Sequence, residues 1–445
     1  MRLWHQNPEA SVARKIFSAS VLIAICTVMV KGVGLVKEQT VAANFGTGDA
    51  LAAFIIALLV PSFFAMVLSG SLNAAFIPTY IRIREQEGEA AAHNLLQRII
   101  CLVLVLLSGA GIVILVAGPA FLPLVGKSFN REGISLARHL LIIVMPLVVI
   151  TGLNVLWGAV LNAHERFSIA ALAPVANPLV IIAFLFLGKS LGIYALAYGT
   201  VLGAILEGAI VVTALMRLQI PVTPLLPKFD SYERQVGIQF LPMISGSFIA
   251  GSNTVIDQAM SAMISPGSVA ILSYGSRLVA FPVGVGASAL GTAAIPYLTV
   301  LFARHDVAEV RNTVKRFLKL VFGVALPVAL AIALFSGPIV RLVYQRGVFS
   351  QADTIIVSSV LAFLSFQIPF YIAGTLLVRV LSSMLLNKLL FYGTIISVFS
   401  NVFLNYILMQ YFGIKGIALS TSLVSIISFF YCGMCINKSL KLHEN

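Results

Sequence analysis

Long apolar stretches, separated by short polar ones, follow one another along almost the whole chain of 445 residues. Most of them reach the ~20 residues that a helix needs to cross a bilayer, and several are longer, which implies tilted helices. The first stretch is too long for a signal peptide and has no small-x-small cleavage site, so we expect it to be retained. We therefore predict twelve membrane-spanning helices, at about residues 16–43, 50–80, 96–124, 133–162, 168–188, 192–216, 236–263, 267–302, 317–340, 353–378, 387–411 and 414–436.

Composition and charge indicate the same class. Hydrophobic residues make up 59% of the chain and charged residues 10%, a balance that excludes an ordinary soluble domain. The net charge of +13 comes from Lys and Arg side chains that lie mostly in polar segments on the side of the two termini. This bias predicts that both termini are cytoplasmic, and it explains the basic charge by contact with the bilayer surface, without nucleic acid as a partner.

Two pairs of similar segments recur at the same spacing of about 220 residues, as expected for two structural repeats in parallel orientation. Residues 71–82 read SLNAAFIPTYIR and residues 289–300 read ALGTAAIPYLTV; residues 192–200 read GIYALAYGT and residues 413–421 read GIKGIALST. A polar, proline-containing segment lies between the two halves. We therefore predict an all-α polytopic membrane protein with pseudo-two-fold symmetry, divided into an N-terminal six-helix lobe (1–217), a cytoplasmic linker (218–234) and a C-terminal six-helix lobe (235–445).

Charged residues inside the predicted spans are the first candidates for function. The first span carries Lys31, Lys37 and Glu38, and the eighth carries Arg277. A charge at bilayer depth is costly, so it normally faces the protein interior or a water-filled cavity. Lys31 and Glu38 are seven residues apart and share a helix face. Nearby glycines, and a proline after Arg277, allow both helices to bend or unwind. We expect a cationic cavity that binds an anionic substrate.

A structural alternative remains open for the same residues. Three intramembrane cations would be balanced by three acids, namely Glu38, Glu207 and Asp257, if all of them met in ion pairs.

Four segments carry a family resemblance. Residues 31–54 (KGVGLVKEQTVAANFGTGDALAAF) followed by 70–78 (GSLNAAFIP) resemble the first two helices of bacterial lipid II flippases, the MurJ/MviN group of the MOP exporter superfamily. Residues 273–296 (SYGSRLVAFPVGVGASALGTAAIP) resemble that family's eighth helix, and residues 339–353 (IVRLVYQRGVFSQAD) resemble the loop after its ninth. The similarity runs in order through about residues 30–440. It implies a multi-pass protein of the bacterial inner membrane.

The resemblance also implies roles for individual residues. Lys31, Lys37 and Arg277 fall where the family carries cavity arginines that hold a lipid-linked pyrophosphate, Glu38 falls on an acid beside the second cation, and Asp49 falls on the acid after the first helix. The chain departs from the family in three respects. Its first helix has lysines where the family has arginines, and its second helix has no arginine pair, since residues 62–66 read SFFAM. We also expect twelve spans, without the two helices that usually follow in the family.

An ion site is expected in the second half. Asn401 and Asn405 are four apart, hence on one helix face, and Asp257 and Thr421 supply further oxygen ligands of the kind that a hard cation prefers. Some family members have a similar sodium site. With one acid, the site would bind Na⁺ weakly; the alternative is that these polar residues join helices. No other cofactor is expected.

Three functions remain open. The first is a monomeric flippase that moves an undecaprenyl-pyrophosphate-linked saccharide, lipid II or an O-antigen or capsule precursor, to the outer leaflet by alternating access. The second is a cation-coupled multidrug antiporter of the same superfamily, and the third is a membrane scaffold. No nucleophile–base–acid arrangement indicates an enzyme.

Overall fold

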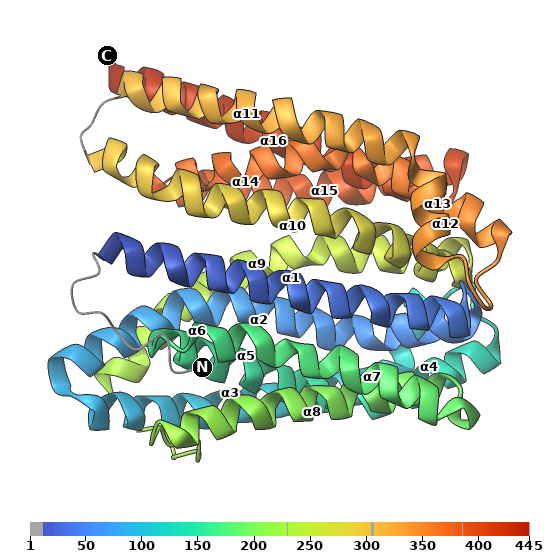
Figure 1. The fold of residues 1–445 in the computed structure, drawn as a ribbon, viewed down its shortest axis with the longest axis horizontal. Helices are drawn as coiled ribbons and strands as arrows, with labels where there is room; N and C mark the ends of the chain where they lie inside the picture. The colour runs from blue at the N-terminus through green and yellow to red at the C-terminus, as the bar shows by residue number, and fades with distance from the viewer. Residues whose placement is uncertain (1–11, 229, 304–306, 385, 445) are drawn as a thin grey trace. The chain divides into compact units, whose positions relative to one another are not determined.

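The computed structural model describes residues 12–228, 230–303, 307–384 and 386–444, and within these ranges the regular structure is entirely helical (Figure 1). In chain order the helices are α1 (Val12–Phe45), α2 (Asp49–Glu87), α3 (Glu89–Val125), α4 (Arg131–Val144), α5 (Leu147–Ala163), α6 (Phe167–Leu172), η1 (Ala173–Val175), α7 (Ala176–Leu187), η2 (Lys189–Leu191), α8 (Ile193–Arg217), α9 (Ser231–Ile264), α10 (Pro266–Ala303), α11 (Val307–Leu334), α12 (Ser336–Tyr344), α13 (Gln351–Ser365), α14 (Gln367–Ser383), α15 (Asn387–Phe412) and α16 (Ile414–Glu444).

Ten segments of the described chain are long and apolar enough to cross a membrane, and each coincides with one of the predicted spans. The other two predicted spans, 16–43 and 236–263, fall within the long helices α1 and α9. The prediction of a polytopic helical membrane fold with about twelve spans is confirmed. The ten segments are Asp49–Leu68, Glu89–Pro123, Arg131–Ala163, Phe167–Leu187, Ile193–Arg217, Pro266–Leu290, Glu309–Leu334, Gln351–Ser383, Asn387–Phe412 and Ile414–Ser439.

Helix boundaries follow local chemistry. The span 131–163 is divided into α4 and α5 at Pro146, because proline has no N–H for the helical ladder. Ser350 closes a capping box with Asp353 at the start of α13, which satisfies the first amide groups of that helix. Gly192 before α8 and Gly413 before α16 both have a φ of 55°, so the internal repeat extends to the backbone conformation at these two turns.

Both α1 and α10 are continuous α-helices, through Gly32 and Gly34 in one and through Pro282, Gly284 and Gly286 in the other, so neither helix is unwound at these residues. Gly286 has a different role, since a Cβ there would lie 2.5 Å from Cδ1 of Ile372. The glycine lets α10 approach α14 closely.

The chain divides into two compact units, each built from three stretches. Unit 1 comprises Met1–Glu38, Leu68–Gly111 and Pro146–Leu241; unit 2 comprises Gln39–Val67, Ile112–Met145 and Pro242–Asn445. In unit 1, α8 packs against α5 and α7; in unit 2, α16 packs against α14 and α15, and α10 packs against α13 and α14 (Figure 1). The lobe boundaries drawn from the sequence stay a prediction.

The linker after α8 is held against α3 within unit 1. Leu225 donates its N–H to the Gln97 carbonyl at 3.1 Å, and Nη1 of Arg98 lies 2.5 Å from a carboxylate oxygen of Asp230 and 3.5 Å from one of Glu233. Partial burial by itself raises the pKa of Asp230, but the N–H groups of the following residues and Arg98 more than offset it, so this pKa is lowered. The described residues of the linker therefore pack within unit 1.

Candidate functional site

Two charged residues of the first helix form an ion pair. Glu38 is buried and pairs with its neighbour Lys37, and the shared face predicted for Glu38 and Lys31 stays a prediction. Lys31 is exposed on α1. This pairing is a contact of the kind that the structural alternative expects, and of Lys31 and Lys37 it leaves Lys31 as the more accessible cation.

Arg277 and Asp49 lie in unit 2, whereas the two lysines lie in unit 1. Arg277 is half-buried on α10, within electrostatic range of the Tyr344 phenol. Asp49 is exposed at the first position of α2, where a negative charge is favourable for the helix. A cavity that joins these residues to Lys31 and Lys37 stays a prediction.

The residues expected to form an ion site are in mutual contact within unit 2. One carboxylate oxygen of Asp257 accepts hydrogen bonds from the Nδ2 atoms of Asn401 at 2.9 Å and Asn405 at 2.7 Å. The other accepts from Oγ1 of Thr421 at 3.2 Å. Three helices, α9, α15 and α16, therefore meet at one carboxylate, and both asparagines are fully buried. We call these four residues the Asp257 cluster.

The cluster has a feature that fits a bound cation. Oδ1 of Asn405 is buried and has no hydrogen-bond partner among the described residues, although buried carbonyl oxygens are normally satisfied. A cation ligated here would satisfy it, and an all-oxygen donor set suits Na⁺. The described residues contain no group of three or more His, Cys, Asp or Glu side chains that could hold a metal ion, so the cluster would bind with a single carboxylate.

A second set of contacts in unit 2 was not predicted. The turn between α1 and α2 is hydrogen-bonded to α10 and to the α12–α13 turn. Val348 donates its N–H to the Ala43 carbonyl at 2.9 Å, Tyr274 donates its hydroxyl to the Gly46 carbonyl at 3.1 Å, and the Thr47 hydroxyl donates to the Asp353 carboxylate. We call these contacts the turn cluster.

Two glycines make the turn cluster possible. Gly46 and Gly347 have φ angles of 54° and 60°, a region in which residues with a side chain are strained. A Cβ at Gly347 would lie 2.2 Å from the Ala43 carbonyl oxygen, and one at Gly46 would lie 3.2 Å from the Val348 carbonyl oxygen. The two turns therefore meet backbone to backbone. In the sequence, the only indication of this contact was the presence of glycines within the family-like segments 31–54 and 339–353.

Comparison with known proteins covers most of the chain. A family profile described as lipid II flippase MurJ matches residues 41–445. The probable lipid II flippase MurJ of Rickettsia prowazekii is 24% identical over 438 residues, which is 96% of this chain and 85% of that protein. The lipid II flippase MurJ of Burkholderia cenocepacia is 25% identical over 381 residues, which is 82% of this chain and 72% of that protein.

Solved structures show the same fold. A structure of lipid II flippase MurJ in an inward closed conformation superposes with a TM-score of 0.80 at 24% identity, over 94% of this chain and 87% of that one. An inward-facing multidrug resistance MATE family transporter of the MOP superfamily superposes with a TM-score of 0.76 at 17% identity, over 95% and 99%. Because the family profile takes in all but the first residues, the chain belongs to the MurJ family of lipid II flippases.

Proposed function

We propose that this protein is a flippase that moves lipid II, or a similar undecaprenyl-pyrophosphate-linked saccharide, from the cytoplasmic to the outer leaflet of the bacterial inner membrane. The observation that carries the proposal is the family match over residues 41–445. The fold is shared with multidrug transporters, so it supports transport without choosing the substrate. Intramembrane cations favour an anionic substrate over a cationic drug.

In this proposal the pyrophosphate is held by Lys31, Lys37 and Arg277. A guanidinium can bind phosphate oxygens through two parallel hydrogen bonds, whereas an ammonium acts as a point charge. Arg277→Ala is therefore expected to abolish transport at normal protein levels, and Arg277→Lys to restore part of it. Lys31→Ala is expected to impair transport, and Lys31→Arg to be tolerated.

Complementation tests this proposal and separates the glycans. The gene and its Arg277→Ala variant would be expressed in a strain depleted of its lipid II flippase and in a strain lacking an O-antigen flippase. Rescue of the first strain alone, lost in the variant, supports lipid II as substrate; rescue of the second alone assigns the O-antigen-type alternative. Rescue of neither strain, with the protein present in the membrane, contradicts the proposal.

We further propose alternating access, with the turn cluster closing one side of the transport path. Its contacts are a few hydrogen bonds, which contribute about 0.5–1.5 kcal/mol net each, or about 1.5–3 kcal/mol for the bond to the Asp353 carboxylate, so they can break and re-form during a transport cycle. A disulfide between cysteines at Thr47→Cys and Asp353→Cys should stop transport, and reduction should restore it. Undiminished transport by the fully oxidised variant would exclude this role.

The Asp257 cluster is proposed to hold Na⁺ as a coupling ion. A ligand shifts a conformational balance only by its difference in affinity between the two states, and an ion at this cluster would favour the state in which α9, α15 and α16 are together. Flipping would be compared in sodium and in potassium at a fixed membrane potential, for wild type and Asp257→Asn. Equal rates in all four conditions would leave the cluster as a structural contact between helices.

A further inference from the structure

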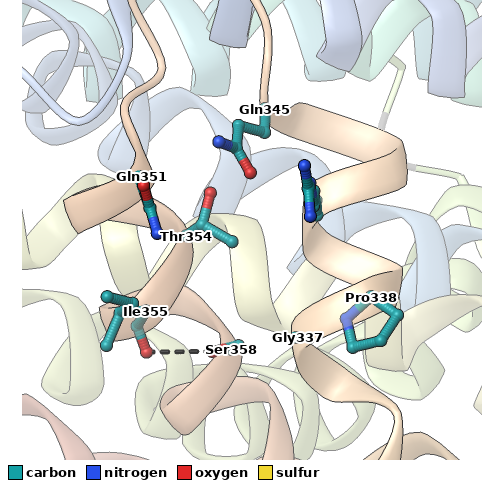
Figure 2. Close-up of a pocket in the computed structure, with 8 residues that line it drawn as sticks. Gly337, Pro338, Gln345, Gln351, Thr354, Ile355 and Ser358 are labelled. Atoms are coloured by element: carbon teal, nitrogen blue, oxygen red, sulfur yellow. Dashed lines mark hydrogen bonds between the residues drawn. The ribbon is translucent and has the colours of Figure 1, made fainter.

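A hollow of about 360 Å³ lies between α12 and the start of α13, within unit 2 (Figure 2). Its polar lining comes from Arg341, Gln345, Gln351, Thr354 and Ser358, and its apolar lining from Gly337, Pro338 and Ile355. Neither the candidate cation residues nor the Asp257 cluster lines it. We call it the α12–α13 pocket.

The pocket offers hydrogen-bond donors that the described protein does not use. Within the described part of the chain, Arg341 has no ion-pair partner and the side-chain amides of Gln345 and Gln351 have no hydrogen-bond partner. Figure 2 shows Gln345, Gln351 and Thr354 facing the same space. The hydroxyls of Thr354 and Ser358 donate to backbone carbonyls, at 3.0 and 2.9 Å, so their oxygens remain able to accept.

Charge in the pocket is positive. No carboxylate is among the lining residues. Asp353, which precedes the lining residue Thr354 in sequence, is bonded to the backbone N–H and hydroxyl of Ser350 and to the Thr47 hydroxyl. An arginine flanked by two carboxamides matches a phosphate group, which accepts two parallel bonds from the guanidinium and further bonds from neutral donors.

The surroundings of the pocket are those of a membrane interface. Residues 335–350 connect two candidate spans, which end at Leu334 and begin at Gln351; if both segments cross the bilayer, α12 lies at its boundary. Phe335, Leu342 and Val348 are large apolar residues that are 60%, 76% and 62% exposed. A short helix with exposed apolar residues and an arginine is suited to lie in the headgroup region, with its apolar side chains among the acyl chains.

We propose that the α12–α13 pocket binds the phosphate-bearing headgroup of a membrane lipid, with Arg341 contacting the phosphate and Gln345 and Gln351 contacting its oxygens. Phe335 and Leu342 would lie beside the first carbons of the acyl chains. Both an anionic phospholipid and the polyprenyl pyrophosphate carrier have this chemistry. None of the proposed pyrophosphate-binding residues lines this pocket, so the inference stands whether or not the chain flips lipid.

Lipid binding by the full chain in detergent tests the proposal directly. Fluorescent phosphatidylglycerol would be bound to the protein and then displaced by one of four unlabelled competitors: phosphatidylglycerol, undecaprenyl pyrophosphate, phosphatidylcholine or inorganic phosphate. Arg341→Gln is expected to weaken binding of the phosphate lipids about tenfold or more, since charge-assisted hydrogen bonds are lost, and Arg341→Lys to weaken it less. The matched control is Lys415→Gln, which removes one exposed cation outside the pocket and should leave binding unchanged.

A second variant separates binding from folding. Gln351 is the first residue of α13 after the cap Ser350, where a negative charge stabilises a helix. Gln351→Glu should therefore keep the thermal stability of the protein while it repels a phosphate group and weakens lipid binding.

The outcomes assign the source of the ligand. If the variants lose affinity for phosphatidylglycerol alone, the ligand is a bilayer phospholipid. If they lose affinity for undecaprenyl pyrophosphate alone, the ligand is the carrier lipid. Competition by inorganic phosphate without lipid binding would overturn the proposal of a lipid site. Equal lipid affinity in wild type, Arg341→Gln and Gln351→Glu would overturn the pocket altogether.

Discussion

Replacement of Gly347 by alanine should open the turn cluster. The left-handed φ of 60° costs a residue with a side chain roughly 1–2 kcal/mol. The new Cβ would lie 2.2 Å from the Ala43 carbonyl oxygen, and this oxygen belongs to the backbone, so the two turns have to separate. Separation loses the bond from the Val348 N–H to Ala43, worth about 0.5–1.5 kcal/mol net. The closed arrangement should therefore be destabilised by roughly 2–3 kcal/mol.

Hydrogen exchange at the Val348 amide measures this effect without any transport assay. Because 1.4 kcal/mol corresponds to a factor of ten, exchange in Gly347→Ala should be roughly 30- to 150-fold faster than in wild type. The control is Gly413→Ala, which also has a positive φ, 55°, but a Cβ there would meet no atom within 4 Å, and it lies outside the turn cluster. An unchanged exchange rate at Val348 in Gly347→Ala, with the protein folded, would refute the reasoning.

Three further predictions concern the ionic and polar contacts. The pKa of Asp230 is lowered in the folded state, so the ionised carboxylate stabilises the fold above the unfolded carboxyl pKa of about 3.9, and this stabilisation is lost as the pH falls through the lower folded value. The difference in melting temperature between wild type and Arg98→Gln should therefore shrink between pH 6 and pH 3. A constant difference would contradict this prediction. Lys37→Ala should lower the thermal stability, and in a double-mutant cycle Glu38→Gln should offset part of this loss. Additive effects of the two substitutions would mean that the pair is not coupled. Asp257→Leu should lower the free energy of unfolding by about 1–3 kcal/mol, because it leaves buried asparagine amides without an acceptor. An unchanged free energy of unfolding would show that the amides find other partners.

The sequence sufficed for what depends on local periodicity. Apolar length located the spans, and the four-residue spacing of Asn401 and Asn405 placed both amides on one face, where they meet Asp257. The family resemblance was confirmed by the profile match over residues 41–445, which includes residues 273–296, and by the fold.

What the sequence could not supply depends on contacts between distant segments or on side-chain reach. The seven-residue spacing concerns only the helix face that Glu38 shares with Lys31; the pair with Lys37 forms because the long, flexible stem of this lysine lets its ammonium reach the neighbouring carboxylate. The turn cluster joins residues 43–47 to residues 274 and 348–353, and no local pattern encodes such a pairing. Helix α1 also continues through Gly32 and Gly34, although glycine is a weak helix former.

Flipping of lipid II by the purified protein in proteoliposomes is the direct test of the proposed function. Fluorescent lipid II would be followed from one leaflet to the other, with wild type, Arg277→Ala and protein-free liposomes compared at equal lipid content. We expect rapid translocation by wild type and a rate at the protein-free level for Arg277→Ala. Equal rates for wild type and protein-free liposomes, for lipid II and for other undecaprenyl-pyrophosphate-linked saccharides alike, would contradict it.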